Sequence, residues 1–151
     1  MTTTDLTAET STRAVAAEFL RLVGAGDPDA VATLFADTVD WKLNWPEDEH
    51  GRTATPWIIH RSTRADVADN FRALTTFHER IDTELERVLF DGAHAVVLGV
   101  IRQTAQPTGR AYRARFALHL TVVDGLITRY HIYEDSLAIA QAFAPGTDAA
   151  V

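Results

Sequence analysis

Three titratable side chains near the end of the chain recur at every second residue: His131, Tyr133 and Asp135. In a strand, residues spaced by two share one face of the sheet. Desolvation on an apolar wall raises the pKa of a carboxyl, which suits it for general acid or base catalysis near neutral pH. A neighbouring His or Tyr can orient that carboxyl or stabilise an oxyanion. The spacing therefore makes Asp135, supported by His131 and Tyr133, the first catalytic candidate.

The preceding strand should face these residues, because Asp124-Gly125 is a two-residue hairpin signal. With a simple two-residue loop, pairs proceed outward from Val123 and Leu126. One face then collects an apolar set with titratable groups at one end, in the pairs Val122/Ile127, Leu120/Arg129, Leu118/His131, Phe116/Tyr133 and Ala114/Asp135. An apolar wall with few polar groups predicts a small-molecule pocket. The opposite face should hold a cross-strand ion pair, Arg115–Glu134.

Two alternatives stay open for this hairpin. A bulge in either strand would invert the face assignment and bring His119 inward, so His119 is a fourth catalytic candidate. Asp135 also stands where a helix begins, and an N-cap is the commonest structural use of Asp at such a position.

The elements that must position these residues follow from periodicity and turn signals. The first half is mainly helical, with Asp27-Pro28 and the capping-box pattern at residues 63–66 as helix starts. Alternation over 39–45 predicts one strand there, followed by a long loop to about residue 60. The second half predicts four strands and a short last helix, over residues 80–90, 94–104, 111–123, 126–134 and 136–143. This order predicts an α+β fold: a curved mixed or antiparallel sheet, with one early strand plus a four-strand meander, and three N-terminal-half helices enclosing a pocket.

Aromatic and aliphatic side chains should form the walls of that pocket. Trp41, Trp45 and Trp57 lie on the early strand and the loop after it, where they could form a lid over an apolar ligand or pack in the core. Phe116 and Leu118 lie on the apolar face of the hairpin. These five residues are the substrate-binding candidates.

Composition excludes several function classes. The 151 residues suit a single domain, with an ordered core expected at about 8–143. A net charge of −7 disfavours nucleic acid and anionic membranes as partners. No apolar run is long enough for a membrane span and no signal peptide is evident, so a cytoplasmic location is expected. The chain has no cysteine, its six histidines are scattered, and the acidic residues 47–49 suggest a solvated loop, so we expect no metal site and no cofactor.

The phrase Leu34-Phe-Ala-Asp-Thr-Val-Asp-Trp41 and the ending from Ile127 to Phe143, together with the order of elements, resemble the SnoaL-like branch of the nuclear-transport-factor-2-like superfamily. The resemblance covers about residues 8–143 and implies a cone-shaped α+β scaffold that hosts many chemistries. The last strand of SnoaL-like polyketide cyclases typically reads Trp-x-x-x-Asp, and its Asp is the general acid/base. The matching residues here are His131 and Asp135, with His in place of Trp. The cyclases also use a His on the preceding strand, near the position of His119.

Sister activities fit less well. Ketosteroid isomerases carry their catalytic Asp just before a Pro on the first strand, whereas this chain has Trp45-Pro46. Limonene-epoxide hydrolases need Arg-x-Asp on a middle strand, and Arg102-Gln103-Thr104 lacks the Asp. Scytalone dehydratase-like sites use two His with Tyr and Asp, types that are present here at unconfirmed spacing.

Two classes of function remain. The first is a cofactor-independent cyclase or isomerase that acts by general acid/base catalysis on a hydrophobic, polyketide-like metabolite, with epoxide opening as a variant of this chemistry. The second is a non-catalytic small-molecule-binding module on the same fold. A homodimer is expected in either case, from the resemblance and the mixed outer face of the sheet.

Overall fold

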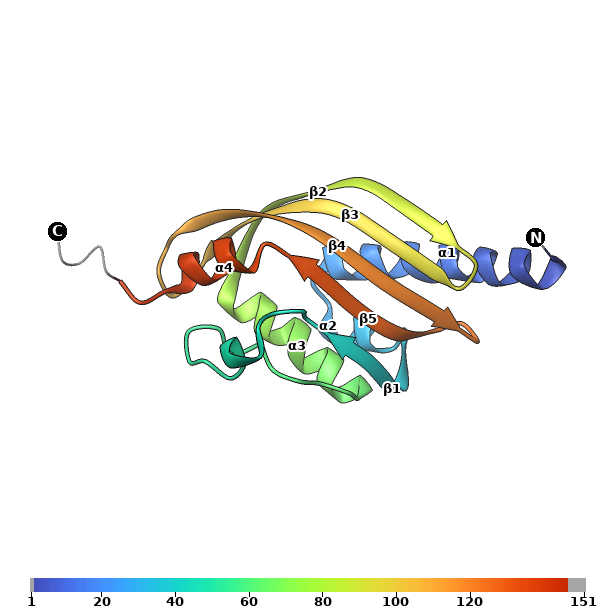
Figure 1. Cartoon of the computed structure of the whole chain (residues 1–151), viewed down its shortest axis with the longest axis horizontal. Helices are drawn as coiled ribbons and strands as arrows, with labels where there is room; N and C mark the ends of the chain where they lie inside the picture. The colour runs from blue at the N-terminus through green and yellow to red at the C-terminus, as the bar shows by residue number, and fades with distance from the viewer. Residues whose placement is uncertain (1, 147–151) are drawn as a thin grey trace.

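The computed structural model describes residues 2–146, and its helices lie mostly in the N-terminal half, ahead of a five-stranded mixed sheet that does not close (Figure 1). This α+β arrangement confirms the predicted fold class. The long helix α1 starts earlier than the expected ordered core, and most of the residues after 143, which were expected outside that core, lie outside the described residues. The elements are α1 (Thr3–Ala25), α2 (Pro28–Ala32), β1 (Phe35–Lys42), a 3₁₀ turn η1 (Glu47–Glu49), α3 (Arg64–Phe77), β2 (His78–Asp91), β3 (His94–Ala105), β4 (Ala111–Val123), β5 (Leu126–Glu134) and α4 (Ser136–Phe143).

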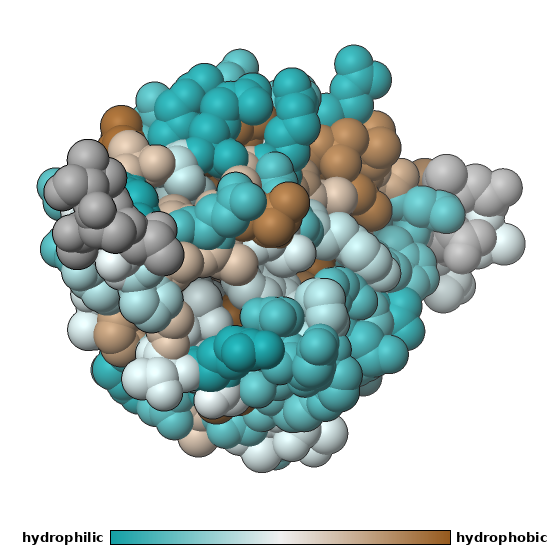
Figure 2. Space-filling model, turned by 60° about the vertical axis from the view of Figure 1, so that its left-hand side comes forward, coloured by the Kyte–Doolittle hydropathy of each residue, from teal (hydrophilic) through white to brown (hydrophobic). Residues whose placement is uncertain are grey.

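Strand order in the sheet is β1-β5-β4-β3-β2, with β1 parallel to β5 and the other neighbours antiparallel. Helices α1, α2 and α3 cover one face of the curved sheet (Figure 1). The other face carries hydrophilic and scattered exposed apolar side chains, among them Leu89 and Tyr133. A view from one end of the molecule shows a mainly hydrophilic surface with apolar residues exposed in separate places (Figure 2). Within residues 2–146 no helix is long and apolar enough to cross a membrane.

Both predicted helix starts are confirmed. Thr63 and Asp66 form a complete capping box, in which each side chain accepts a hydrogen bond from the other residue's backbone N–H. Asp27 caps α2 through the backbone N–H of Ala30, and Pro28 takes the first helical position. The early strand begins sooner than predicted, because Phe35 is fully buried and pairs with Ile127 of β5.

The last hairpin departs from the predicted register. The turn at Asp124-Gly125 has two residues with positive φ, as a type I′ hairpin needs, and Val122 faces Ile127 as expected. An extra residue then enters β5 at Thr128, so Thr121 pairs with Arg129. Because side chains alternate with a period of two, this bulge exchanges the two faces of the rest of β5.

The bulge changes which residues of β5 point toward the helices. Leu120 now pairs with Tyr130, Leu118 with Ile132, and Phe116 with Glu134, while His131 and Tyr133 turn to the outer face. The bulge lies in β5 and not in β4, so His119 also stays on the outer face, opposite His131. The predicted Arg115–Glu134 ion pair is therefore wrong: Arg115 donates to Glu86 across 2.8 Å instead.

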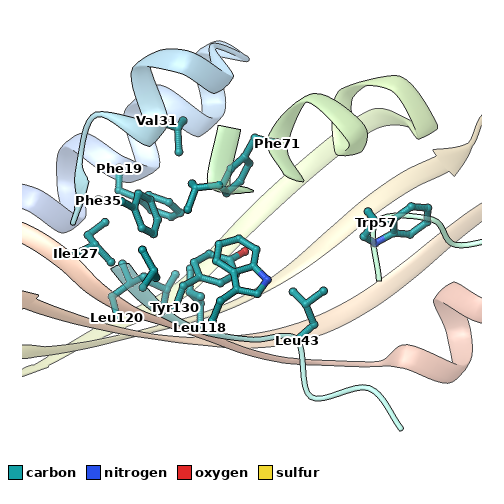
Figure 3. Close-up of a cluster of buried hydrophobic side chains, with 14 of the residues drawn as sticks. Phe19, Val31, Phe35, Leu43, Trp57, Phe71, Leu118, Leu120, Ile127 and Tyr130 are labelled. Atoms are coloured by element: carbon teal, nitrogen blue, oxygen red, sulfur yellow. The ribbon is translucent and has the colours of Figure 1, made fainter. Parts of the chain in front are cut away.

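A cluster of aromatic and aliphatic side chains occupies part of the space between the helices and the sheet (Figure 3). Phe19 from α1 and Phe71 from α3 meet Tyr130 from β5 edge-on. Trp41 stacks on the Tyr130 ring with centroids 4.1 Å apart and an interplanar angle of 10°. This packing holds one wall of the interior in place, because stacked aromatic pairs contribute beyond their buried area.

Candidate functional site

A cavity of about 530 Å³ lies between the helices and the inner face of the sheet. Its walls are mainly apolar, and its volume falls within the range of ordinary small-molecule sites. The exposed residues of its lining lie at the α1–α2 turn, at Thr75 of α3 and on β2, so the cavity opens there. Residues that line it include Phe19, Leu43, Trp57, Phe71, Leu74, Ile101, Phe116, Leu118, Tyr130 and Ile132, with the polar residues Asn70, His78, Gln103, Tyr112 and Glu134.

Glu134 is the central ionisable group of this cavity. It is the last residue of β5 and is partly buried, opposite Phe116. Its Oε1 accepts a hydrogen bond from the indole N–H of Trp45 across 2.9 Å. Burial raises the pKa of Glu134 to about 7, although the Trp45 hydrogen bond acts in the opposite direction. A carboxyl with this pKa can take up or release a proton near neutral pH.

The cavity has one other carboxyl in its lining, Asp27 at the opening. Asp27 already caps α2, so its side chain serves the helix start. Glu134 is thus the single acid of the inner cavity among the described residues.

Two tyrosines share the cavity with Glu134. Burial, and secondarily the charge of Glu134, raise the pKa of Tyr112 and of Tyr130. Both hydroxyls therefore stay protonated at neutral pH. Tyr112 donates to Gln103 Oε1 across 2.6 Å, which fixes its ring.

His78 adds a neutral imidazole. Burial lowers its pKa to about 4, despite a bond with the Leu74 carbonyl at 3.1 Å from Nδ1. A carbonyl only accepts, so Nδ1 carries the proton and Nε2 keeps its lone pair. The ring packs against Trp57 and Phe143, with centroids 4.5 and 4.9 Å away. His78 can thus accept a hydrogen bond without bringing charge into the cavity.

Asn70 lines the cavity from α3 and is only 1% exposed. Its Oδ1 has no hydrogen-bond partner among the described residues. A buried amide oxygen without a partner costs about 1–3 kcal/mol, a cost that a bound ligand can remove. Asn70 is therefore a ligand-orienting candidate that the sequence pattern did not single out.

None of the four catalytic candidates from the sequence lines this cavity. Asp135 caps α4 by accepting from the Ala138 N–H across 3.1 Å, the alternative left open for it. Tyr133 is 51% exposed, and with Asp135 it borders a shallower groove on the outer face.

His131 and His119 lie next to each other on the outer face of the sheet, with ring centroids 6.2 Å apart, and each makes its own polar contact. His131 Nε2 lies 3.0 Å from Asp40 Oδ1, and this contact is the main cause that holds the pKa of Asp40 below its usual range. His119 Nε2 lies 2.9 Å from His94 Nδ1. Burial, followed by the neighbouring charges, lowers the pKa of His119.

The substrate-binding candidates divide into two groups. Trp57, Phe116 and Leu118 line the cavity. Trp41 is instead part of the aromatic core, and Trp45 acts through its bond to Glu134. Glu134 itself was missed because the unbulged register placed it on the outer face. The one signal for it was that a bulge would exchange the two faces.

Solved structures show the same fold at low identity. An NTF2-like protein of Burkholderia thailandensis is 21% identical and has a TM-score of 0.74, over 89% of this chain and 98% of that one. A Mycobacterium tuberculosis LEH-like epoxide hydrolase is 16% identical with a TM-score of 0.67, over 89% and 90%. A Catenulispora acidiphila protein with a ketosteroid isomerase-like fold, solved with trimethylamine, is 16% identical with a TM-score of 0.67, over 87% and 93%.

No curated protein matches the chain in sequence. The family model for the SnoaL-like domain, in contrast, matches residues 16–130, which is well over half of the chain. This match agrees with the resemblance found in the sequence and with the NTF2-like structural neighbours. The chain therefore belongs to the family of SnoaL-like domains.

Proposed function

We propose that this chain is a cofactor-independent enzyme that isomerises or cyclises a hydrophobic small molecule by general acid/base catalysis at Glu134. The observation that carries the proposal is the placement of one hydrogen-bonded carboxyl inside an otherwise mainly apolar cavity. Membership of the SnoaL-like family and the isomerase-like fold support small-molecule chemistry of this type.

In the reaction, the Glu134 carboxylate takes a proton from a carbon next to a carbonyl. The electron pair of the broken C–H bond moves toward the carbonyl oxygen and forms an enolate. In an isomerisation, Glu134 then returns the proton at another carbon. In a cyclisation, the enolate carbon attacks a second carbonyl of the same molecule, and Glu134 returns the proton to the new alkoxide. Neither sequence needs an oxidant or reductant.

The protonated tyrosines suit stabilisation of the enolate. A neutral hydroxyl donor placed near a developing oxyanion lowers the barrier, and its effect is larger in a site that excludes water. Tyr130 is the better candidate, because the Tyr112 hydroxyl already donates to Gln103. Trp45 stabilises the carboxylate form of Glu134 through its indole N–H, which keeps this base available despite burial.

The substrate class follows from the walls. A mainly apolar cavity of about 530 Å³ suits a molecule with a hydrophobic body and few oxygen functions, such as a small polyketide-like ketone. Asn70 Oδ1 can accept a hydrogen bond from a hydroxyl of such a molecule, at the helix wall across from the sheet. Epoxide opening is less well supported, because the inner cavity offers no second acid among described residues to activate water.

Deuterium exchange tests the chemistry without knowledge of the natural substrate. Apolar cyclic ketones such as 1-tetralone are incubated with the protein in D₂O, and loss of the α-hydrogen signal is followed by NMR. Glu134→Gln should slow the exchange by about 10²–10⁴-fold, the usual contribution of a positioned acid/base. Asp135→Asn is the matched control and should exchange at the wild-type rate, because Asn also caps helices well.

Other results would overturn the assignment. Loss of exchange in Asp135→Asn with retention in Glu134→Gln would return the catalytic role to Asp135. Binding of the ketones with no exchange in any protein, wild type included, would favour a binding module.

We also propose that two copies pair through the outer face of the sheet. That face alternates ion pairs, such as Arg115 with Glu86 and Arg102 with Asp82, with the exposed apolar side chains of Leu89 and Tyr133. Light scattering should give the mass of a dimer, and the mass of a single chain would contradict this proposal.

A further inference from the structure

The loop between β1 and α3 brings Glu47, His50 and His60 together. One potential ligand atom from each residue lies within 4.8 Å of the other two. His60 Nε2 is 2.5 Å from Glu47 Oε1, and the rings of His50 and His60 stack with centroids 4.5 Å apart. Among the side chains that the structure describes, no other group of three His, Cys, Asp or Glu residues gathers in this way.

Local backbone geometry explains how scattered residues meet. In a 3₁₀ turn the side chains at i and i+3 lie nearly above one another, and the turn at Glu47–Glu49 relates Glu47 to His50 in this way. The Gly51 N–H then donates to the Ile58 carbonyl across 2.9 Å, and Gly51 has a φ of +75° that favours glycine. This bond closes the loop and returns His60 to the side of the other two residues.

The hydrogen bond between Glu47 and His60 does not give His50 a partner. His50 Nδ1 is buried and has no hydrogen-bond partner among the described residues. The lone pair of a neutral imidazole nitrogen makes it a common metal ligand. Ligation of a cation would give this nitrogen a partner, which the hydrogen bond between Glu47 and His60 does not.

We propose that Glu47, His50 and His60 form a Zn²⁺ site, with one carboxylate oxygen, two imidazole nitrogens and a water molecule as the fourth ligand. Two His and one Glu are a usual zinc donor set, whereas Mg²⁺ and Ca²⁺ prefer oxygen ligands only. The side chains of Glu47 and His60 are 77% and 71% exposed, so they can rotate to tetrahedral spacing as the metal replaces their shared proton. Asp48 adds negative charge nearby, whereas the charge of Glu49 is balanced by Arg52.

A metal ion bound here would link the two ends of the loop between β1 and α3, which borders the cavity. Trp45, two residues before Glu47, donates to Glu134, and Trp57, three residues before His60, lines the cavity wall. Zinc would therefore restrain the two indoles without touching the substrate. The site goes beyond the proposed function and does not depend on it, since metal binding requires no catalysis at Glu134.

Titration of the chelator-treated protein with ZnCl₂ in a calorimeter tests the site. Wild type should bind one Zn²⁺ per chain at micromolar concentration, and its Tm should rise with added zinc, because a ligand that binds only the folded state stabilises it. His60→Ala and Glu47→Gln should each weaken binding by at least about tenfold, because loss of a ligand costs no less than loss of a supporting contact. Both residues are exposed, so circular dichroism should show folded variants.

Two variants serve as matched controls. Glu49→Gln removes an acid of the same loop outside the cluster, and His94→Ala removes a histidine on the outer face of the sheet. Both should bind Zn²⁺ as tightly as wild type. The proposal is overturned if wild type binds no single equivalent, if His60→Ala and Glu47→Gln bind normally, or if His94→Ala abolishes binding.

Discussion

Trp45 donates its indole N–H to Glu134 Oε1 across 2.9 Å and so connects the loop after β1 to the end of β5. The two residues are far apart in the chain. Trp45 is buried, as the alternation over 39–45 predicts, although Asn44 just before it has a φ of +57°. Glu134, in contrast, is displaced from its predicted face, because the bulge in β5 turns it inward. This one irregularity places an acid with an elevated pKa in the cavity.

Loss of this hydrogen bond should raise the pKa of Glu134 further. The bond favours the charged carboxylate, so Trp45→Phe removes a stabilising contact from that form and leaves the desolvation unopposed. Carboxyl-carbon NMR of the variant should show Glu134 titrating above about 7. The carboxyl of Asp66, whose pKa is held below its usual range by hydrogen bonds from the backbone N–H of Ser62 and then from Thr63, serves as an unchanged internal reference. A Glu134 pKa that stays or falls would show that the indole is not its partner in solution.

The ionisation of Glu134 should make the free energy of unfolding fall as pH rises. The carboxyl titrates near 4.5 when unfolded and at about 7 when folded, so the folded state holds the extra proton between these values. Stability from this group is therefore present at low pH and is lost as pH rises through about 7, by up to about 3 kcal/mol. Urea denaturation should show that Glu134→Gln lacks this loss. Parallel stability curves for the two proteins from pH 4.5 to 8 would refute a raised pKa.

The ionisation of His78 should change the free energy of unfolding in the opposite direction, so that it falls as pH falls. Its folded pKa of about 4 lies below the unfolded value of 6.5, so stability from the neutral ring is complete above 6.5 and is lost as pH falls toward 4. His78→Phe keeps an aromatic ring among Trp57 and Phe143 but cannot take up a proton. In acid unfolding followed by circular dichroism, the variant should lose less stability between neutral pH and pH 4 than wild type does. The same unfolding pH midpoint for both proteins would argue against a buried neutral His78.

The rate of ketone exchange should follow the ionisation of the base. Glu134 is active as a carboxylate, so the exchange rate should rise with pH and level off above about 7. A rate that levels off near pH 4 would instead indicate an ordinary exposed carboxyl.

Asn70→Leu should stabilise the free protein and weaken ligand binding. Leu is close in shape and removes a buried amide oxygen that lacks a partner, so we expect a gain of about 1–2 kcal/mol in unfolding free energy. Asn44→Leu is the contrasting control, because Asn44 donates to the Ile132 carbonyl and has a positive φ. That substitution should destabilise the protein. A destabilised Asn70→Leu would show that the amide has a structural partner.

Local signals in the chain were enough for the parts of the fold that depend on near neighbours. The capping box at Thr63 and Asp66, the N-cap at Asp27 and the Asp124-Gly125 turn all involve residues within four positions of each other. The α+β order and the family resemblance follow from such patterns over the whole length. The candidate wall residues Trp57, Phe116 and Leu118 were also identified from type and periodicity.

The position of the reactive carboxyl could not be predicted in the same way. One extra residue at Thr128 decides which face Glu134 and Asp135 take, and that bulge is set where β5 pairs with β4 on one side and β1 on the other. The meeting of Glu47, His50 and His60 depends on a loop closed by a backbone hydrogen bond. Composition and spacing thus decided the class of fold and the family. Long-range strand pairing and loop closure, which no local pattern encodes, decided which side chains meet in the cavity and on the loop.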